Sequence, residues 1–72
     1  MYKANFESSR FSFEAYGETE KVAIASLKLG LVRHAKQYGI EPDWWVKYEG
    51  DINTIEIECG SCYRDYEKIG QY

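Results

Sequence analysis

The chain has 72 residues, and its nine basic and twelve acidic residues give a net charge of −3. A chain of this length forms one small domain, which buries only about 60% of the surface that its unfolded state exposes. No apolar run approaches the ~18 residues of a membrane span, and the first residues lack the apolar segment of a signal peptide. We therefore expect one cytoplasmic domain over residues 1–72, without contact to a membrane.

The charge is unevenly distributed along the chain. Residues 21–38 contain four of the nine basic residues and no acidic one, so they carry +4, while the remainder carries −7. The overall acidity disfavours non-specific binding to nucleic acid, because that binding depends on neutralising phosphates. The local excess of basic residues leaves nucleic acid as a less favoured partner.

Two short segments near the start alternate between apolar and polar residues. Residues 2–7 and 11–16 both show this alternation, which predicts two strands. Ser8, Ser9 and Arg10 lie between them and form either a turn or a bulge. We favour the turn, which makes the two segments an antiparallel hairpin; a bulge would make one bent strand.

A long helix is predicted from Thr19 to Tyr38. Thr19 is a suitable N-cap, Gly39 suits the residue after the helix, and Pro42 prevents its continuation. At 100° per residue, one side of this helix forms an apolar stripe that should face a sheet. This inner stripe consists of Ala23, Ile24, Leu27, Leu31, Ala35 and Tyr38. Gly30 lies on the flank, where it either permits a close backbone contact or is a tolerated cost.

The opposite side of the helix is also apolar, with a basic rim. Its apolar residues are Val22, Ala25, Leu29 and Val32, and its basic residues are Lys21, Lys28, Arg33 and Lys36. Both stripes cannot face one sheet, so the second requires another partner. We predict a binding surface formed by Val22, Leu29, Val32, Lys21, Lys28, Arg33 and Lys36. The alternative is that the C-terminal tail covers this side.

The second half of the chain predicts a further hairpin. We expect strands at Trp44–Tyr48 and Thr54–Cys59, joined by the turn-rich residues 49–53. Residues 63–72 suit either another strand or a short helix. The predicted fold is therefore α+β, an antiparallel sheet of three or four strands with one long helix packed on one face, in the order β(β)αββ. The predicted core is Phe6, Phe11, Phe13, Ile24, Leu27, Leu31, Ala35, Val46, Ile55 and Ile57.

Residues 11–25, FSFEAYGETEKVAIA, resemble small bacteriophage-encoded proteins, in which an aromatic strand, an acidic break and an alanine-rich helix follow one another. The resemblance covers roughly residues 1–40 and includes no diagnostic motif. It implies a β(β)αββ fold, a location in the host cytoplasm and a role in binding and inhibiting host machinery. It assigns no site residues.

The motif Cys59-Gly60-Ser61-Cys62 offers two thiols, and His34 is the one histidine. A structural zinc site needs four ligands, so one chain cannot supply a closed site from these three residues. A reducing cytoplasm also argues against a disulfide, which leaves two ordinary thiols as the favoured interpretation. Redox chemistry and zinc binding are the alternatives. We expect His34 to be half-buried or hydrogen-bonded.

The pair of neighbouring tryptophans has a structural and a functional interpretation. Trp44 and Trp45, as neighbours on a strand, would place one indole on each face of the sheet. The outward indole, with Tyr48 or Tyr16, could then form an aromatic platform that stacks on a nucleic-acid base, although ordinary cross-strand packing is favoured.

No nucleophile–base pair, phosphate-binding loop or complete metal set is present, so we predict no enzyme activity and no cofactor. The favoured function is a small non-enzymatic binding protein, a phage accessory protein or inhibitor that docks on a host protein or on a second copy of itself. The alternatives are a nucleic-acid-binding module that uses the basic helix, and a CxxC redox or zinc protein.

Overall fold

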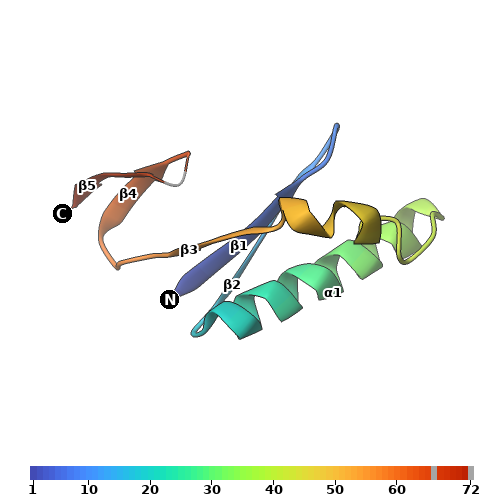
Figure 1. Cartoon of the computed structure of the whole chain (residues 1–72), viewed down its shortest axis with the longest axis horizontal. Helices are drawn as coiled ribbons and strands as arrows, with labels where there is room; N and C mark the ends of the chain where they lie inside the picture. The colour runs from blue at the N-terminus through green and yellow to red at the C-terminus, as the bar shows by residue number, and fades with distance from the viewer. Residues whose placement is uncertain (66, 72) are drawn as a thin grey trace.

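The computed structural model describes residues 1–65 and 67–71 and has an α+β fold (Figure 1). An antiparallel three-stranded sheet, in the order β2-β1-β3, is packed against one 19-residue helix. A separate two-stranded hairpin, β4–β5, completes the chain. The elements are β1 (Tyr2–Glu7), β2 (Ser12–Gly17), α1 (Glu20–Tyr38), the 3-10 helix η1 (Val46–Asp51), β3 (Asn53–Glu56), β4 (Ser61–Arg64) and β5 (Glu67–Gln71). In the part of the chain described, no helix has the length and apolarity needed to cross a membrane.

The N-terminal hairpin and the helix form as predicted. A turn joins β1 to β2, closed by a 2.8 Å hydrogen bond from the Ser8 amide to the Phe11 carbonyl. The Thr19 side chain caps α1 by accepting a hydrogen bond from the Val22 amide. Gly39 ends the helix in the left-handed conformation, with φ of 67°. That conformation strains residues with a Cβ atom, which is why glycine suits this position.

The core lies between α1 and one face of the sheet. Ala4 and Phe6 of β1 are buried against Ala23, Leu27 and Leu31 of α1. Alternate residues of a strand point to opposite faces, so the intervening residues of β1 form the outer face of the sheet. Of the predicted core, Phe6, Leu27, Leu31 and Ala35 are buried, and Phe13 and Ile24 are half-buried against it. The prediction that Phe11 belongs to the core is wrong, because this residue, beside the β1–β2 turn, is 41% exposed.

The predicted strand at Trp44–Tyr48 is wrong. Residues 42–45 form turns that lead into η1, with backbone hydrogen bonds spanning three residues, such as that from the Val46 amide to the Asp43 carbonyl. Both indoles consequently pack on the same core instead of on two sheet faces, and Trp45 is 9% exposed. Val46, a predicted core residue, is exposed.

The strand after the turn-rich segment exists but pairs differently from the prediction. β3 spans Asn53–Glu56 and pairs with β1, with Lys3 opposite Ile55 and Ala4 opposite Thr54. This register places Ile55 on the outer face of the sheet, where it and Ile57 line a cavity beside Lys3. The prediction that Ile55 and Ile57 belong to the core is therefore wrong.

The last residues form strands and no helix in the part that the structure describes. β4 and β5 pair with each other on the side of the sheet opposite α1 (Figure 1). Tyr63 of β4 lines the cavity on the outer face of the sheet. Its hydroxyl accepts a hydrogen bond from the Glu58 amide and donates one to the Glu56 carbonyl. Of the predicted tail, Tyr66 and Tyr72 lie outside the described residues.

Candidate functional site

The outer face of α1 is open to solvent along its length. Because Leu27 and Leu31 are buried against the sheet, the residues half a turn away must point outward. Val22 is 48% exposed, Leu29 is 53% exposed and Val32 is 40% exposed. The described part of the tail, residues 61–65 and 67–71, lies across the sheet from this face, so the alternative that the tail covers it is wrong.

The four basic residues of α1 have two different environments. The Lys28 ammonium lies 2.7 Å from Oε1 of Glu49 and 5.6 Å from the ring centroid of Trp45, so it is directed toward η1. Lys21, Arg33 and Lys36 are exposed, and no ion pair joins them to any residue that the structure describes. The rim of the outer face therefore carries three cations available to a partner.

His34 is half-buried, as expected, and lies among aromatic rings. Its centroid lies 5.0 Å from Phe11, 4.9 Å from Phe13, 4.6 Å from Tyr38 and 5.6 Å from Trp44. Rings at these separations pack favourably in tilted or edge-to-face arrangements, as these do. His34 thus joins the end of α1 to β2 and to the turn before η1.

Cys59 and Cys62 are exposed free thiols. Cys59 lies in the turn after β3, and Cys62 lies in β4 rather than at the start of a helix. A thioredoxin-type site depends on a helix N-terminus to stabilise the thiolate, so this geometry does not support that chemistry. Within residues 1–65 and 67–71, no three His, Cys, Asp or Glu side chains are placed to hold a metal ion.

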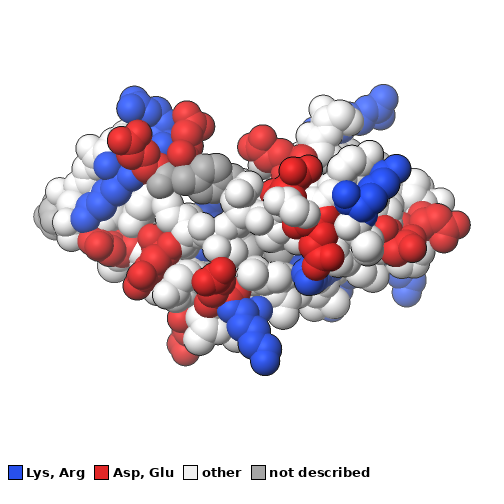
Figure 2. Space-filling view, viewed as in Figure 1, with Lys and Arg blue, Asp and Glu red and all other residues white. Residues whose placement is uncertain are grey.

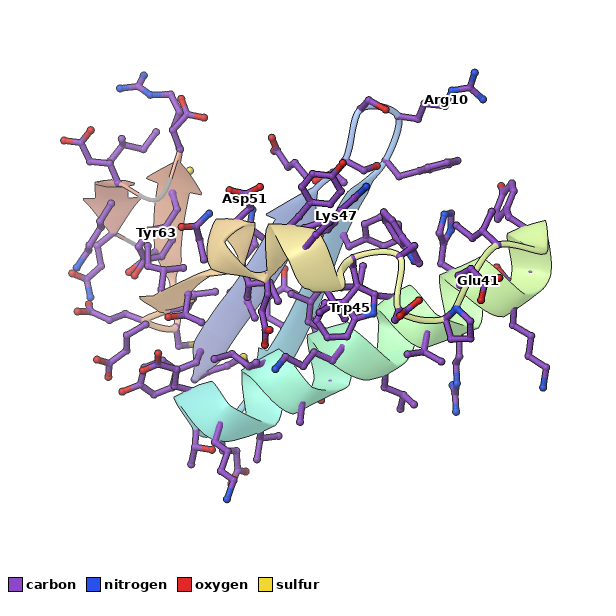
Figure 3. The ribbon with its side chains drawn as sticks, turned by 45° about the vertical axis from the view of Figure 1, so that its right-hand side comes forward. Arg10, Glu41, Trp45, Lys47, Asp51 and Tyr63 are labelled. Atoms are coloured by element: carbon purple, nitrogen blue, oxygen red, sulfur yellow. The ribbon has the colours of Figure 1, made fainter. Side chains whose placement is uncertain are left out.

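A groove that the sequence did not reveal lies between η1 and the β1–β2 turn. Its volume is about 450 Å³, and the rings of Phe6, Trp44 and Tyr48 line it together with Glu7 and Asp51. We call it the acidic–aromatic groove. In Figure 2, acidic side chains gather where the end of η1 meets the sheet, and Figure 3 shows Asp51 at the end of η1 that faces β4 and β5.

The sequence contained one signal for this groove. The sequence predicts that one of the two indoles forms an aromatic platform with Tyr48 or Tyr16, and Trp44 and Tyr48 both line the groove. Tyr16, the other candidate, points to the outer face of the sheet, opposite Lys3. Glu7 and Asp51 gave no signal, because they are far apart in the chain and come together only when β1 and η1 meet.

No protein-family model, no curated protein and no solved structure matches this chain. The resemblance to small phage-encoded proteins stays a prediction.

Proposed function

We propose that this protein is a small non-enzymatic binding protein that docks on an acidic protein surface through the outer face of α1. The observation that carries the proposal is the exposure of Val22, Leu29 and Val32 along one side of a helix whose opposite side is buried in the core at four positions. Those positions are Ala23, Leu27, Leu31 and Ala35. Single exposed aliphatic residues are common, but an aligned set beside exposed cations is typical of an interaction surface.

The charge pattern favours an acidic protein over nucleic acid as the partner. Lys21, Arg33 and Lys36 form a rim around an apolar centre, an arrangement in which the rim steers association and the centre supplies buried area. A surface that binds phosphates would instead benefit from an overall positive charge, whereas the whole chain carries −3. In its most specific form, the proposal is that the protein is encoded by a phage and inhibits a host protein.

Two aspartate substitutions test the docking face. We expect Leu29→Asp and Val32→Asp to leave the fold intact, because both side chains are largely exposed, and to abolish capture of a partner from cells that encode the protein. Val46→Asp is the matched control, since Val46 is 47% exposed on η1 and the substitution adds the same charge. Circular dichroism checks folding, and sedimentation equilibrium detects binding to a second copy.

The outcomes separate the candidate partners. Binding that survives both aspartate variants would place the contact elsewhere and overturn the proposal. Binding that declines steeply with salt, with a linear log–log slope set by the number of phosphate contacts, would indicate nucleic acid instead.

A further inference from the structure

We propose that the acidic–aromatic groove is a binding site for an organic cation, with a guanidinium group on an aliphatic stem as the chemistry that fits it best. The site is separate from the outer face of α1. It is formed by the end of β1, the turn at Ser8 and Ser9, the turn that holds Trp44, and η1.

The aromatic part of the groove suits the stem and the flat face of such a group. Phe6 is 2% exposed and forms the base, and its ring centroid lies 5.8 Å from that of Trp44 in an edge-on arrangement. The Trp44 indole is fixed by a 3.2 Å hydrogen bond from Nε1 to the Leu31 carbonyl. Tyr48 already accepts a cation, because the ammonium of Lys47 lies 5.2 Å from its ring centroid. Aromatic faces attract cations in this range, and guanidinium groups also stack on them.

The acidic part continues into a second cavity of about 350 Å³ that shares Glu7 and Asp51 with the groove. Asp65 from the β4–β5 turn, Asn5 and Asn53 line this second cavity. Of the described residues that line the two cavities, three bear carboxylates and none is a lysine or arginine. A cation entering past the aromatic rings therefore reaches a region lined by three carboxylates. The nearby cations are Lys47, whose ammonium lies over the Tyr48 ring, and Lys3, which lines a neighbouring cavity with Glu7 and Asp65.

Asn5 gives a second observation, independent of the carboxylates, that favours a ligand with hydrogen-bond donors. It is a buried polar residue, 7% exposed, on the outer face of β1. Its Oδ1 accepts no hydrogen bond from any residue that the structure describes. A buried acceptor without a donor is costly, and Asn5 lines the second cavity. A ligand there that brings several N–H groups would relieve this cost once the Asn5 side chain turns toward it.

A guanidinium matches these features better than a metal ion. Among the described residues the carboxylates do not converge on a metal position, whereas a guanidinium presents five donors in a planar fork that can reach separated acceptors. An anion is disfavoured by Glu7, Asp51 and Asp65. The aromatic lining would remain unused by a small hydrated ion.

A pair of isosteric probes tests the charge requirement. We would titrate the ¹⁵N-labelled full chain with arginine capped at both ends and with equally capped citrulline, which replaces the guanidinium by a neutral urea. The indole N–H signal of Trp44, distinguished from that of Trp45 by the variant Trp45→Phe, reports occupation of the groove. We expect capped arginine to shift this signal and capped citrulline to bind at least about tenfold more weakly.

Matched variants locate the site. Glu7→Gln and Asp51→Asn should each weaken capped arginine about two- to fivefold, the range for exposed charged pairs. Tyr48→Leu should weaken it through loss of the ring. Glu41→Gln is the control, since it removes the same charge from an exposed residue that lines neither cavity.

Several results would overturn the proposal: no shift of the Trp44 signal, equal binding of capped citrulline, or equal weakening by Glu41→Gln. Butylguanidinium distinguishes the source of the cation. Binding equal to that of capped arginine indicates a free small molecule, and weaker binding indicates the side chain of a polypeptide; either result supports the guanidinium chemistry. Leu29→Asp should bind capped arginine normally, so failure of the docking face and failure of this site are distinguishable.

Discussion

Gly17 and Gly30 differ in the space around them, and this space determines whether a larger side chain fits at each position. A Cβ atom at Gly17 would lie 2.6 Å from the backbone nitrogen of Ala23 and 2.9 Å from the carbonyl carbon of Val22. Both atoms belong to the first turns of α1, so they cannot move without moving the helix. At Gly30, in mid-helix, no atom lies within 4 Å of such a Cβ atom apart from its chain neighbours and the nearby backbone of the helix itself. The close backbone contact considered for Gly30 is therefore not made within the described chain, whereas Gly17 makes one.

This contrast gives a prediction with its own internal control. Gly17→Ala should lower the free energy of unfolding by about 1–3 kcal/mol, the usual cost of forcing an atom into packed space. Gly30→Ala should raise it by about 0.5–1 kcal/mol, because alanine restricts the unfolded chain and favours the helix. Urea denaturation followed by circular dichroism measures both. Destabilisation by Gly30→Ala would show that a partner backbone approaches this position.

At the scale of an element, α1 has one side that stabilises the fold and one that is free to bind. Leu31→Ala should lower the free energy of unfolding by about 2–5 kcal/mol, since Leu31 is fully buried. Leu29→Ala changes the same atoms on the exposed side and should stay within about 0.5 kcal/mol of the unsubstituted chain. Thermal unfolding compares the two variants. Equal losses of unfolding free energy in Leu29→Ala and Leu31→Ala would mean that the outer face is buried in the protein as it exists in solution.

The β4–β5 hairpin has few connections to the rest of the fold. Every residue of β5 is exposed. The described polar links to the preceding chain are the hydroxyl of Tyr63, the 3.2 Å hydrogen bond from the Ser61 amide to the Glu58 carbonyl, and the ion pair of Lys68 with Glu58, at 2.8 Å. An isolated two-stranded hairpin is marginally stable in water, and an exposed ion pair contributes little.

Hydrogen exchange tests this weakness. The amides of residues 61–65 and 67–71 should exchange much faster than those of Ala4 and Leu31, because the hairpin opens without unfolding the core. Tyr63→Phe removes the hydroxyl links and should accelerate exchange in the hairpin further, while the urea midpoint of the whole chain stays unchanged. Hairpin amides as protected as those of the core would contradict this account.

At the scale of the whole molecule, the segment between α1 and β3 closes the core from one side. Figure 3 shows Trp45 between η1 and α1, and the Lys28 ammonium lies over its ring. The three-stranded sheet and a single helix leave an open flank, and the two indoles fill it. This role makes Trp45 a core residue although it belongs to neither the sheet nor α1.

Substitutions of Trp45, with its exposed neighbour Val46 as the control, test this role. Trp45→Ala should lower the free energy of unfolding by about 3–5 kcal/mol, which is enough to unfold a small domain. Trp45→Phe should cost less, because Nε1 of Trp45 has no hydrogen-bond partner among the described residues. Val46→Ala should change the stability by no more than about 0.5 kcal/mol. Chemical denaturation separates these cases, and a larger loss for Val46→Ala would restore the predicted strand as the better description.

The outer face of α1 could be predicted from the sequence, whereas the acidic–aromatic groove could not. Val22, Leu29 and Val32 follow the helical period, and this period alone determines that they share a side. The groove combines β1, the turn that holds Trp44, and η1, and Asp51 and Glu7 become neighbours only through packing.

The sequence by itself determined the local structure: the β1–β2 hairpin, the α1 boundaries set by Thr19 and Gly39, and the buried side of the helix. These features depend on residues a few positions apart, whose preferences act within one strand or one turn. Only the tertiary structure decided that β3 pairs with β1, and that Ile55 lies outside the core. Alternation assigns Ile55 and Thr54 to opposite faces, but which face meets the helix depends on the register with a strand from the other end of the chain.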